Sequence, residues 1–182
     1  RHPSARPQWR VSDADRRWLA DFLRARRLPP GRLLGIFPGG SHPVKRWPLQ
    51  SFLELARQAR REFGLKPVFV FGPKEGRLKQ EYLQEGGKLS WTADGLTPGK
   101  LAALWSACRA VVSNDAFPMH VGPAVGTPTL GLFGPGEPEV WFPYSAGAGH
   151  VAVHAAPGCW PCHKNVCLSL IHISEPTRLR RI

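Results

Sequence analysis

Short runs of almost entirely apolar residues, with no regular alternation of polar residues, restrict the fold of this chain most strongly. They occupy residues 33–37, 67–72, 110–113 and 129–133, with a further short segment at 89–92. An uninterrupted apolar run of this length is typical of a strand in a parallel sheet that is buried on both faces. Amphipathic helical segments separate the runs, and a further helix is expected at 13–27, before the first run. The alternation predicts an α/β fold, a Rossmann-like parallel sheet with helices on both faces and right-handed crossovers.

The segment between the last two runs holds a short polar cluster. Residues 118–125 suit one helix, because proline is tolerated in a first helical turn and Gly126 fits the position just after a helix end. Asn114 or Asp115 is the expected N-cap. Open α/β sheets bind ligands at the carboxyl ends of their strands, and a helix N-terminus there favours an anion. Asp115 and His120 are therefore candidate site residues; an N-cap aspartate and a core histidine bonded to a carbonyl are the alternatives.

The loop after the first run carries a second group of candidates. Gly39 and Gly40 follow the run directly, and glycines there let the backbone approach a ligand. Ser41 and Lys45 could then bind a diphosphate through charge-assisted hydrogen bonds. The alternative is that Lys45 and its neighbour Arg46 are solvated while the following tryptophan covers the core.

Glu75 follows the second run and has two interpretations. A carboxylate just past a strand end can accept hydrogen bonds from ribose hydroxyls. An acidic residue in the first turn of the next helix would instead be stabilised by the helix dipole. The residues around Glu75 leave both interpretations open.

The chain is strongly basic. Its 182 residues contain 25 Lys and Arg against 13 Asp and Glu, a formal net charge of +12, which indicates an anionic partner. The arginines are scattered and no nucleic-acid-binding motif is present, so nucleic acid is not the expected partner. With neither a signal peptide nor a long apolar run, the expected location is the cytoplasm.

Several of these motifs occur together in a known order. Lys45 to Pro48, Phe71 to Glu75, Asn114 to His120 and Gly126 to Pro135 make residues 33–167 resemble glycosyltransferase family 9, the bacterial lipopolysaccharide heptosyltransferases. The resemblance implies the C-terminal, nucleotide-sugar-binding half of a two-domain GT-B fold. Residues 1–11 are then expected to be a linker and 12–167 an incomplete donor-binding domain.

The resemblance also assigns roles to residues. It implies that heptose is transferred from ADP-heptose to the lipopolysaccharide inner core with inversion, and that no cofactor is required. The donor-binding residues that it implies are Ser41 and Lys45 for the diphosphate, Glu75 for the ribose, and a donor-site group of Asp115, Ala116, Phe117, Pro118, Met119 and His120.

One departure from the family pattern affects this donor site. Ala116 and Phe117 stand where the family usually has Ser or Thr followed by Gly. Phenylalanine makes a positive φ and a close backbone approach costly, which puts donor affinity or donor identity in doubt.

The resemblance implies that the other half of the enzyme holds the acceptor surface and the catalytic carboxylate. We therefore expect no catalytic base in this chain and no turnover by the chain alone. The implied partners are the nucleotide-sugar and the lipopolysaccharide-core acceptor, with a peripheral contact to anionic lipid at the cytoplasmic face of the inner membrane. The alternatives are a GT-B transferase using a UDP- or GDP-sugar, and a non-catalytic module that binds nucleotides or polyanions.

Cysteines gather near the C-terminus. Cys159, Cys162, His163 and Cys167 have spacing that could hold zinc, but structural thiols are the preferred interpretation, and no metal site is predicted. Cys108 is expected to lie at the end of the helix that precedes residue 110 and to be a small core residue. Residues 168–182 no longer follow the family and are predicted to be a non-native tail resembling translated adapter sequence.

Overall fold

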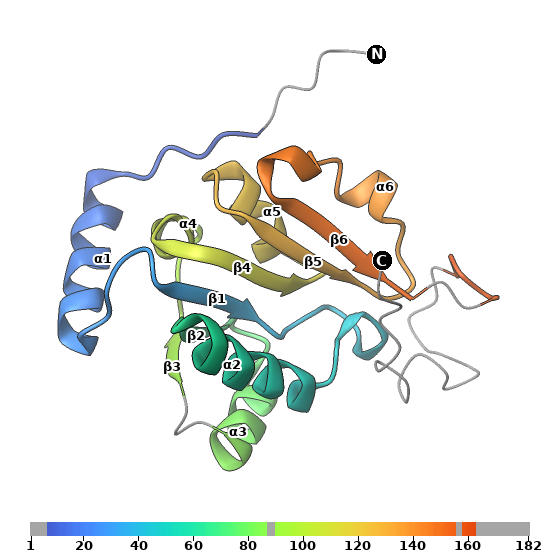
Figure 1. Ribbon diagram of the computed structural model, residues 1–182, viewed down its shortest axis with the longest axis horizontal. Helices are drawn as coiled ribbons and strands as arrows, with labels where there is room; N and C mark the ends of the chain where they lie inside the picture. Colours follow the sequence, from blue (N-terminus) through green and yellow to red (C-terminus); the bar gives the residue numbers. More distant parts are fainter. Residues whose placement is uncertain (1–6, 87–89, 156–157, 163–182) are drawn as a thin grey trace.

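A single six-stranded parallel sheet forms the centre of the protein (Figure 1). The computed structural model describes residues 7–86, 90–155 and 158–162. The strands lie in the order β3-β2-β1-β4-β5-β6. Their bounds are β1 Leu33–Phe37, β2 Lys66–Phe71, β3 Trp91–Asp94, β4 Cys108–Asn114, β5 Thr129–Phe133 and β6 His150–His154. The predicted Rossmann-like α/β class is confirmed, because this is the strand order of the dinucleotide-binding folds.

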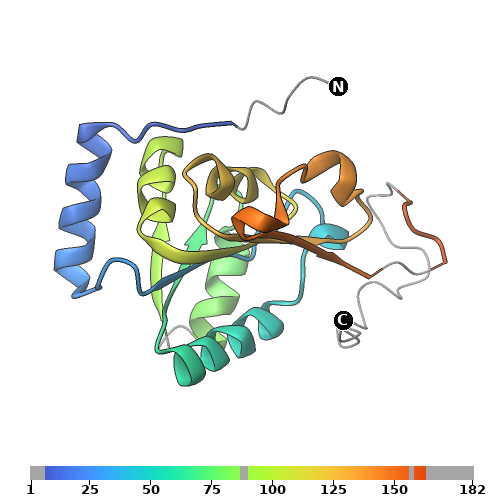
Figure 2. The same cartoon turned by 45° about the horizontal axis from the view of Figure 1, so that its top comes forward.

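Helices cover both faces of the sheet (Figure 2). Helices α1, α4 and α5 lie on one face, and α2 and α3 on the other. The bounds are α1 Asp13–Arg26, α2 Leu49–Phe63, α3 Gly76–Glu85, α4 Pro98–Ser106, α5 Phe117–Ala124 and α6 Pro138–Trp141, with short 3-10 turns η1 Pro43–Lys45 and η3 Ala146–Ala148. Among the described residues, no helix is both long and apolar enough to cross a membrane.

Local sequence explains where the helices begin and end. The Ser12 hydroxyl accepts a hydrogen bond from the Asp15 amide and caps α1, and the Thr97 hydroxyl caps α4 in the same way through the Lys100 amide. Gly64 ends α2 in the left-handed conformation (φ 64°), which glycine adopts without a steric penalty. The linker predicted at 1–11 is partly attached to the domain, since the Trp9 amide donates to the Ala124 carbonyl.

Three details differ from the sequence-based expectations. Strand β3 begins at Trp91, so Ser90 of the expected segment 89–92 is not part of it, and residue 89 lies outside the described residues. Strand β6 was not predicted, because its sequence HVAVH is short and only partly apolar. Cys108 is the core residue that we expected, but it begins β4 rather than ending α4; its thiol donates to the Leu104 carbonyl at 3.2 Å, and burial raises its pKa far above the usual range.

Candidate functional site

The predicted site residues meet at the carboxyl ends of β1 and β4. These two strands are neighbours in the sheet, and their registers pair Phe37 with Ser113. Strand β1 lies between β2 on one side and β4 on the other, so the strand order reverses between β1 and β4. Open α/β sheets bind ligands at such a point.

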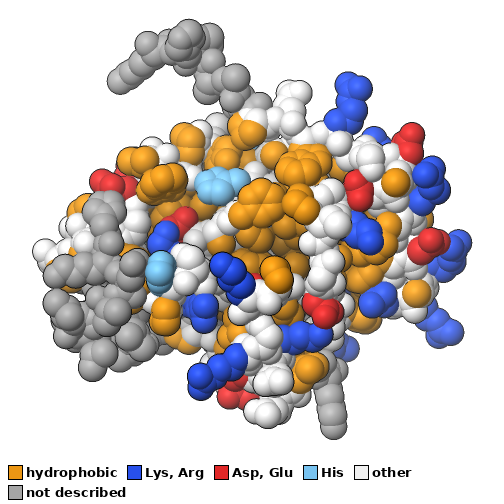
Figure 3. Space-filling model, turned by 180° about the vertical axis from the view of Figure 1, so that it is seen from behind, with side chains coloured by type: hydrophobic (Ala, Val, Ile, Leu, Met, Phe, Trp, Pro, Cys, Tyr) orange, Lys and Arg blue, Asp and Glu red, His pale blue; other side chains and the backbone are white. Residues whose placement is uncertain are grey.

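A pocket of about 360 Å³ lies at this point. Six of the nine predicted donor-site residues line it together with a tryptophan that sequence reasoning missed: Ser41, Lys45, Asp115, Ala116, Phe117, His120 and Trp141. Pro118 and Met119 are buried in the first turn of α5 and do not line the pocket, and Glu75 lies outside it. Figure 3 shows hydrophobic side chains on this side of the molecule around a histidine and a neighbouring pair of opposite charges.

Lys45 and Asp115 form an ion pair inside the pocket. The distance from the lysine Nζ to the aspartate Oδ2 is 2.7 Å. The prediction that Asp115 or Asn114 caps α5 is wrong. Ala116 occupies the N-cap position, and its methyl side chain cannot accept a hydrogen bond; the Asp115 carboxylate accepts from Lys45 instead. The helix N-terminus therefore lines the pocket without a side-chain cap.

The other candidate cap, Asn114, instead connects three parts of the chain. Its side chain is fully buried; Oδ1 accepts from the Trp47 amide at 3.0 Å, and Nδ2 donates to the carbonyls of Pro38 at 2.8 Å and Gly39 at 3.1 Å. These bonds hold the loop after β1 and the start of α2 against the end of β4. A polar amide that ends an apolar strand was the sequence signal for this role.

Arg46 and Gly134 hold the loop after β1 in place. Arg46 is not merely solvated, since its Nε and Nη2 both donate to the Gly40 carbonyl, at 2.9 and 2.7 Å. Gly134, after β5, packs so closely on this loop that an added Cβ would come within 2.2 Å of the Val44 carbonyl oxygen. Trp47 covers the core as the alternative interpretation expected, with its ring edge-on to Phe52.

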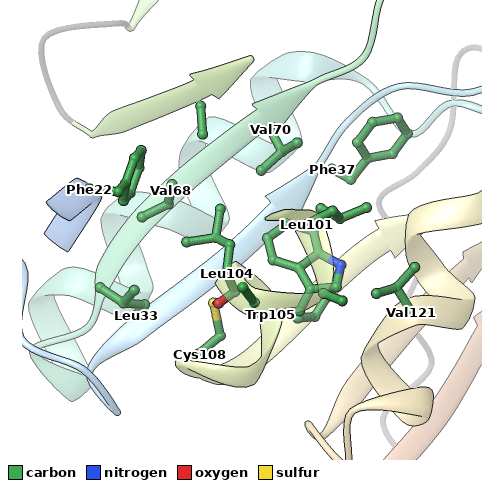
Figure 4. Packing of buried hydrophobic residues seen from close by; sticks show 14 of the residues in the cluster. Phe22, Leu33, Phe37, Val68, Val70, Leu101, Leu104, Trp105, Cys108 and Val121 are labelled. Carbon is green, nitrogen blue, oxygen red and sulfur yellow. The ribbon is translucent and has the colours of Figure 1, made fainter. Parts of the chain in front are cut away.

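The first turn of α5 is held in place by a hydrogen bond from α4. Trp105 of α4 is fully buried, and its indole Nε1 donates to the Pro118 carbonyl at 3.0 Å. Figure 4 shows this indole between Leu101, Leu104 and Val121. A glycine at position 35 makes room for the ring, because an added Cβ there would lie 2.5 Å from it. The pocket wall formed by α5 thus rests on a packed core.

His120 faces the pocket and is bonded to a tyrosine. Its Nδ1 lies 3.0 Å from the Tyr144 hydroxyl, so the interpretation as a core histidine bonded to a carbonyl is wrong. Burial lowers the pKa of His120, and the negative charge of Asp115 opposes this shift only in part. At neutral pH the imidazole is therefore neutral.

Glu75 lies next to the pocket, at the ends of β1 and β2. It occupies the N-cap position of α3 without forming a side-chain cap. Its carboxyl group covers two glycines: an added Cβ at Gly72 would lie 2.5 Å from Oε2, and one at Gly39 would lie 2.9 Å from Cδ. Gly39 therefore makes room for the glutamate as well as bringing backbone close to the site.

Phe117 carries no backbone strain. It is the first residue of α5, and Arg27 is the only non-glycine residue with a positive φ in the part of the chain that the structure describes. The predicted cost of a positive φ at Phe117 is therefore wrong, whereas the expected cost to a close backbone approach stays a prediction. Phe117 and Trp141 are each about half exposed (53% and 55%) and form the apolar side of the pocket.

The cysteine segment is described only in part. His163 and Cys167 lie outside the described residues, as does the predicted tail at 168–182. Between Cys159 and Cys162, Trp160 donates to the Gly136 carbonyl at 3.1 Å and stacks on His154. Within 7–86, 90–155 and 158–162, no group of three His, Cys, Asp or Glu side chains is placed to hold a metal ion.

The sheet order and the strand-end pocket define a Rossmann-like domain of the GT-B class. The family model for glycosyltransferase family 9 (heptosyltransferase) matches residues 2–171, and the chain belongs to that family. It is 33% identical over 146 residues to lipopolysaccharide heptosyltransferase 2 of Salmonella typhimurium strain LT2, a match covering 76% of this chain and 41% of that protein.

Solved structures of the family show the same fold. The family 9 glycosyltransferase from Veillonella parvula DSM 2008 has a TM-score of 0.75 at 28% identity, covering 85% of this chain and 44% of the other. The E. coli ADP-heptose LPS heptosyltransferase II has a TM-score of 0.64 at 27% identity, covering 85% and 46%. The chain thus spans less than half the length of these relatives.

Proposed function

We propose that this chain is the donor-binding half of an inverting heptosyltransferase that transfers heptose from ADP-heptose to the lipopolysaccharide inner core. Family membership supports the reaction class, and the names of the Salmonella and E. coli relatives support the donor and acceptor. The observation that carries the proposal is the pocket at the end of β4, where the Lys45 ammonium and the uncapped N-terminus of α5 occur together.

The diphosphate of the donor binds between these two groups. An ammonium has three donors, and Asp115 uses one of them, which leaves Lys45 able to contact phosphate oxygens as well. Ser41, Ala116 and Phe117 line the same pocket. Glu75, at the neighbouring strand end, accepts from the ribose hydroxyls.

This arrangement stabilises the departing nucleotide. When the glycosidic bond to ADP breaks, negative charge develops on the terminal phosphate, and fixed positive groups already placed there lower the barrier. Lys45 makes the largest contribution because it carries a full charge in a partly buried position. No cofactor is part of this proposal.

The remaining parts of the reaction belong to the rest of the enzyme. This proposal assigns the carboxylate that deprotonates the acceptor hydroxyl, and the acceptor surface, to a part of the enzyme that this chain does not span. The net charge of +12 supports a peripheral contact with phosphorylated glycolipid and anionic headgroups at the cytoplasmic face of the inner membrane.

Calorimetric titration with ADP, ADP-heptose, UDP and GDP tests this proposal. We expect ADP and ADP-heptose to bind at least about tenfold more tightly than UDP or GDP, a difference of roughly 1.4 kcal/mol. Absence of binding by every nucleotide to a folded sample contradicts the donor site. Tighter binding of UDP or GDP contradicts the heptose donor and favours another GT-B transferase, and equally tight binding of inorganic polyphosphate favours a polyanion-binding module.

A further inference from the structure

The hydroxyl of Tyr144 reaches the pocket only through His120. Tyr144 lies in the loop between α6 and η3, and it does not line the pocket. Its hydroxyl is 3.0 Å from His120 Nδ1, whereas His120 itself lines the pocket beside Lys45 and Asp115. A tyrosine in this position can act on a ligand by setting the orientation and tautomer of the histidine.

The tyrosine ring is held by a cluster of aromatic side chains. It packs edge-on against Phe142 with ring centroids 4.8 Å apart, and against His150 of β6 at 5.8 Å. Phe142 in turn packs on Phe133 of β5, and both are buried. Edge-to-face contacts fix ring orientation, so the position of the hydroxyl is set by Phe142, which packs on the end of β5, and by His150 at the start of β6.

Burial favours the uncharged form of both groups in this hydrogen bond. It raises the pKa of Tyr144, so the hydroxyl keeps its proton, and it lowers the pKa of His120, so the imidazole is neutral at neutral pH. The charged groups that face the ring from other elements are Asp115, which opposes this lowering, and Lys45 of η1. A tyrosine hydroxyl can donate to an imidazole nitrogen or accept from it, and the donating direction at Nδ1 places the imidazole proton on Nε2.

We propose that Tyr144 is a positioning residue that fixes His120 in its Nε2–H tautomer, so that the imidazole offers an uncharged hydrogen-bond donor to the diphosphate or sugar oxygens of the bound donor. The ligand part of this inference rests on the proposed function; the tautomer does not. An uncharged donor next to Lys45 adds a contact to an anion without bringing a second cation beside the ammonium.

The test uses a Tyr144→Phe variant of the whole chain, which removes the hydroxyl and keeps the ring. In ligand-free protein, long-range ¹H–¹⁵N correlation of the imidazole, assigned with a His120→Asn variant, reports the tautomer. We expect the Nε2–H form in the parent and a mixture of both tautomers in Tyr144→Phe. We expect ADP-heptose to bind the variant about fivefold more weakly, the loss of roughly one hydrogen bond.

Tyr82→Phe is the matched control. Tyr82 is a fully buried tyrosine whose hydroxyl has one side-chain partner, Ser90 at 2.7 Å, but it belongs to α3 and packs in the core on the other face of the sheet. We expect this variant to leave the His120 tautomer unchanged and ADP-heptose affinity within twofold of the parent. In a His120→Ala background, Tyr144→Phe should have no further effect on affinity.

Three results would overturn the inference. One is an Nδ1–H tautomer in the parent, and another is an unchanged tautomer in Tyr144→Phe. The third is an equal loss of affinity from Tyr144→Phe with and without His120. If no nucleotide binds at all, the tautomer measurement still decides the role of Tyr144, and only the proposed function fails.

Discussion

Two lysine–aspartate ion pairs of nearly equal length lie at the same end of the sheet and differ in burial. Lys45 Nζ is 2.7 Å from Asp115, the residue after β4, and Lys79 Nζ is 2.6 Å from Asp94, the last residue of β3. The two lysine side chains are 29% and 30% exposed. Asp115, however, is only 10% exposed and Asp94 is 52% exposed.

The difference in carboxylate burial separates the ion pair in the proposed binding site from the ion pair at the surface. A half-exposed pair such as Lys79–Asp94 gains at most about 1 kcal/mol, because water screens it and both side chains lose freedom. Burying the Asp115 carboxylate costs desolvation that one ion pair does not clearly repay. Stability alone therefore does not account for the inner pair, whereas a pocket that needs a fixed ammonium does.

The largest expected effect comes from removing the support of the inner pair. Asn114→Ala leaves the Trp47 amide and the Pro38 and Gly39 carbonyls without their side-chain partner, so we expect a loss of about 3 kcal/mol in the free energy of unfolding. Urea denaturation measures it. Gln50→Ala, at an exposed residue of α2, is the control and should cost less than about 0.5 kcal/mol. A loss no larger than that of the control would show that Asn114 does not hold the loops.

The two lysines provide the most direct test of the comparison. We expect Lys45→Ala to weaken ADP binding about 30-fold, since it removes a charge-assisted contact to phosphate. Lys79→Ala removes the outer pair and should change ADP affinity less than twofold. Calorimetric titration of both variants with ADP measures these two changes in affinity. Equal affinities in Lys45→Ala and the parent would refute the diphosphate contact.

A smaller effect distinguishes the ribose end of the proposed site from the phosphate end. Glu75→Ala is expected to weaken ADP binding about fivefold and to leave pyrophosphate binding unchanged, because pyrophosphate has no ribose hydroxyls. Glu81→Ala, at an exposed residue of the same helix, is the control. A parallel loss for both ligands would mean that Glu75 shapes the phosphate site instead.

The smallest effect is on the pH dependence of stability. The pKa of His120 in the folded protein is below its usual value of 6.5, so the unfolded chain takes up the proton first as the pH falls. The stability linked to His120 is fully present above about pH 6.5 and is lost as the pH falls through the lower folded value. The free energy of unfolding should therefore fall less steeply between pH 7.5 and 5 in His120→Asn than in the parent. Identical slopes would contradict this linkage.

The sequence predicted the sheet well because each buried strand is a continuous apolar run. It also predicted that Ser41, Lys45, Asp115 and His120 come together, since polar residues after such runs gather at one end of a parallel sheet, and these four line one pocket. The sequence could not predict that the Asp115 carboxylate binds Lys45 instead of capping α5. Local cap preference and a contact across 70 residues compete there, and only the folded chain shows that the contact is formed.

Residues brought together over long distances were the ones missed. Trp141 joins the pocket from α6, and Tyr144 joins His120 across 24 residues, without any local motif in either case. Strand β6 was overlooked for a related reason, because its place depends on pairing with β5 rather than on a strongly apolar sequence.

Gly134 has a consequence for how tolerant this domain is to mutation. Because its missing Cβ lets the chain after β5 touch the Val44 carbonyl, any larger residue there pushes apart two backbones. In a saturation library selected only for folding, position 134 should accept glycine alone, whereas neighbouring pocket positions should accept many residues. Gly134 lies in a stretch that resembles a family motif, but the close packing on Val44 is by itself enough to require glycine there.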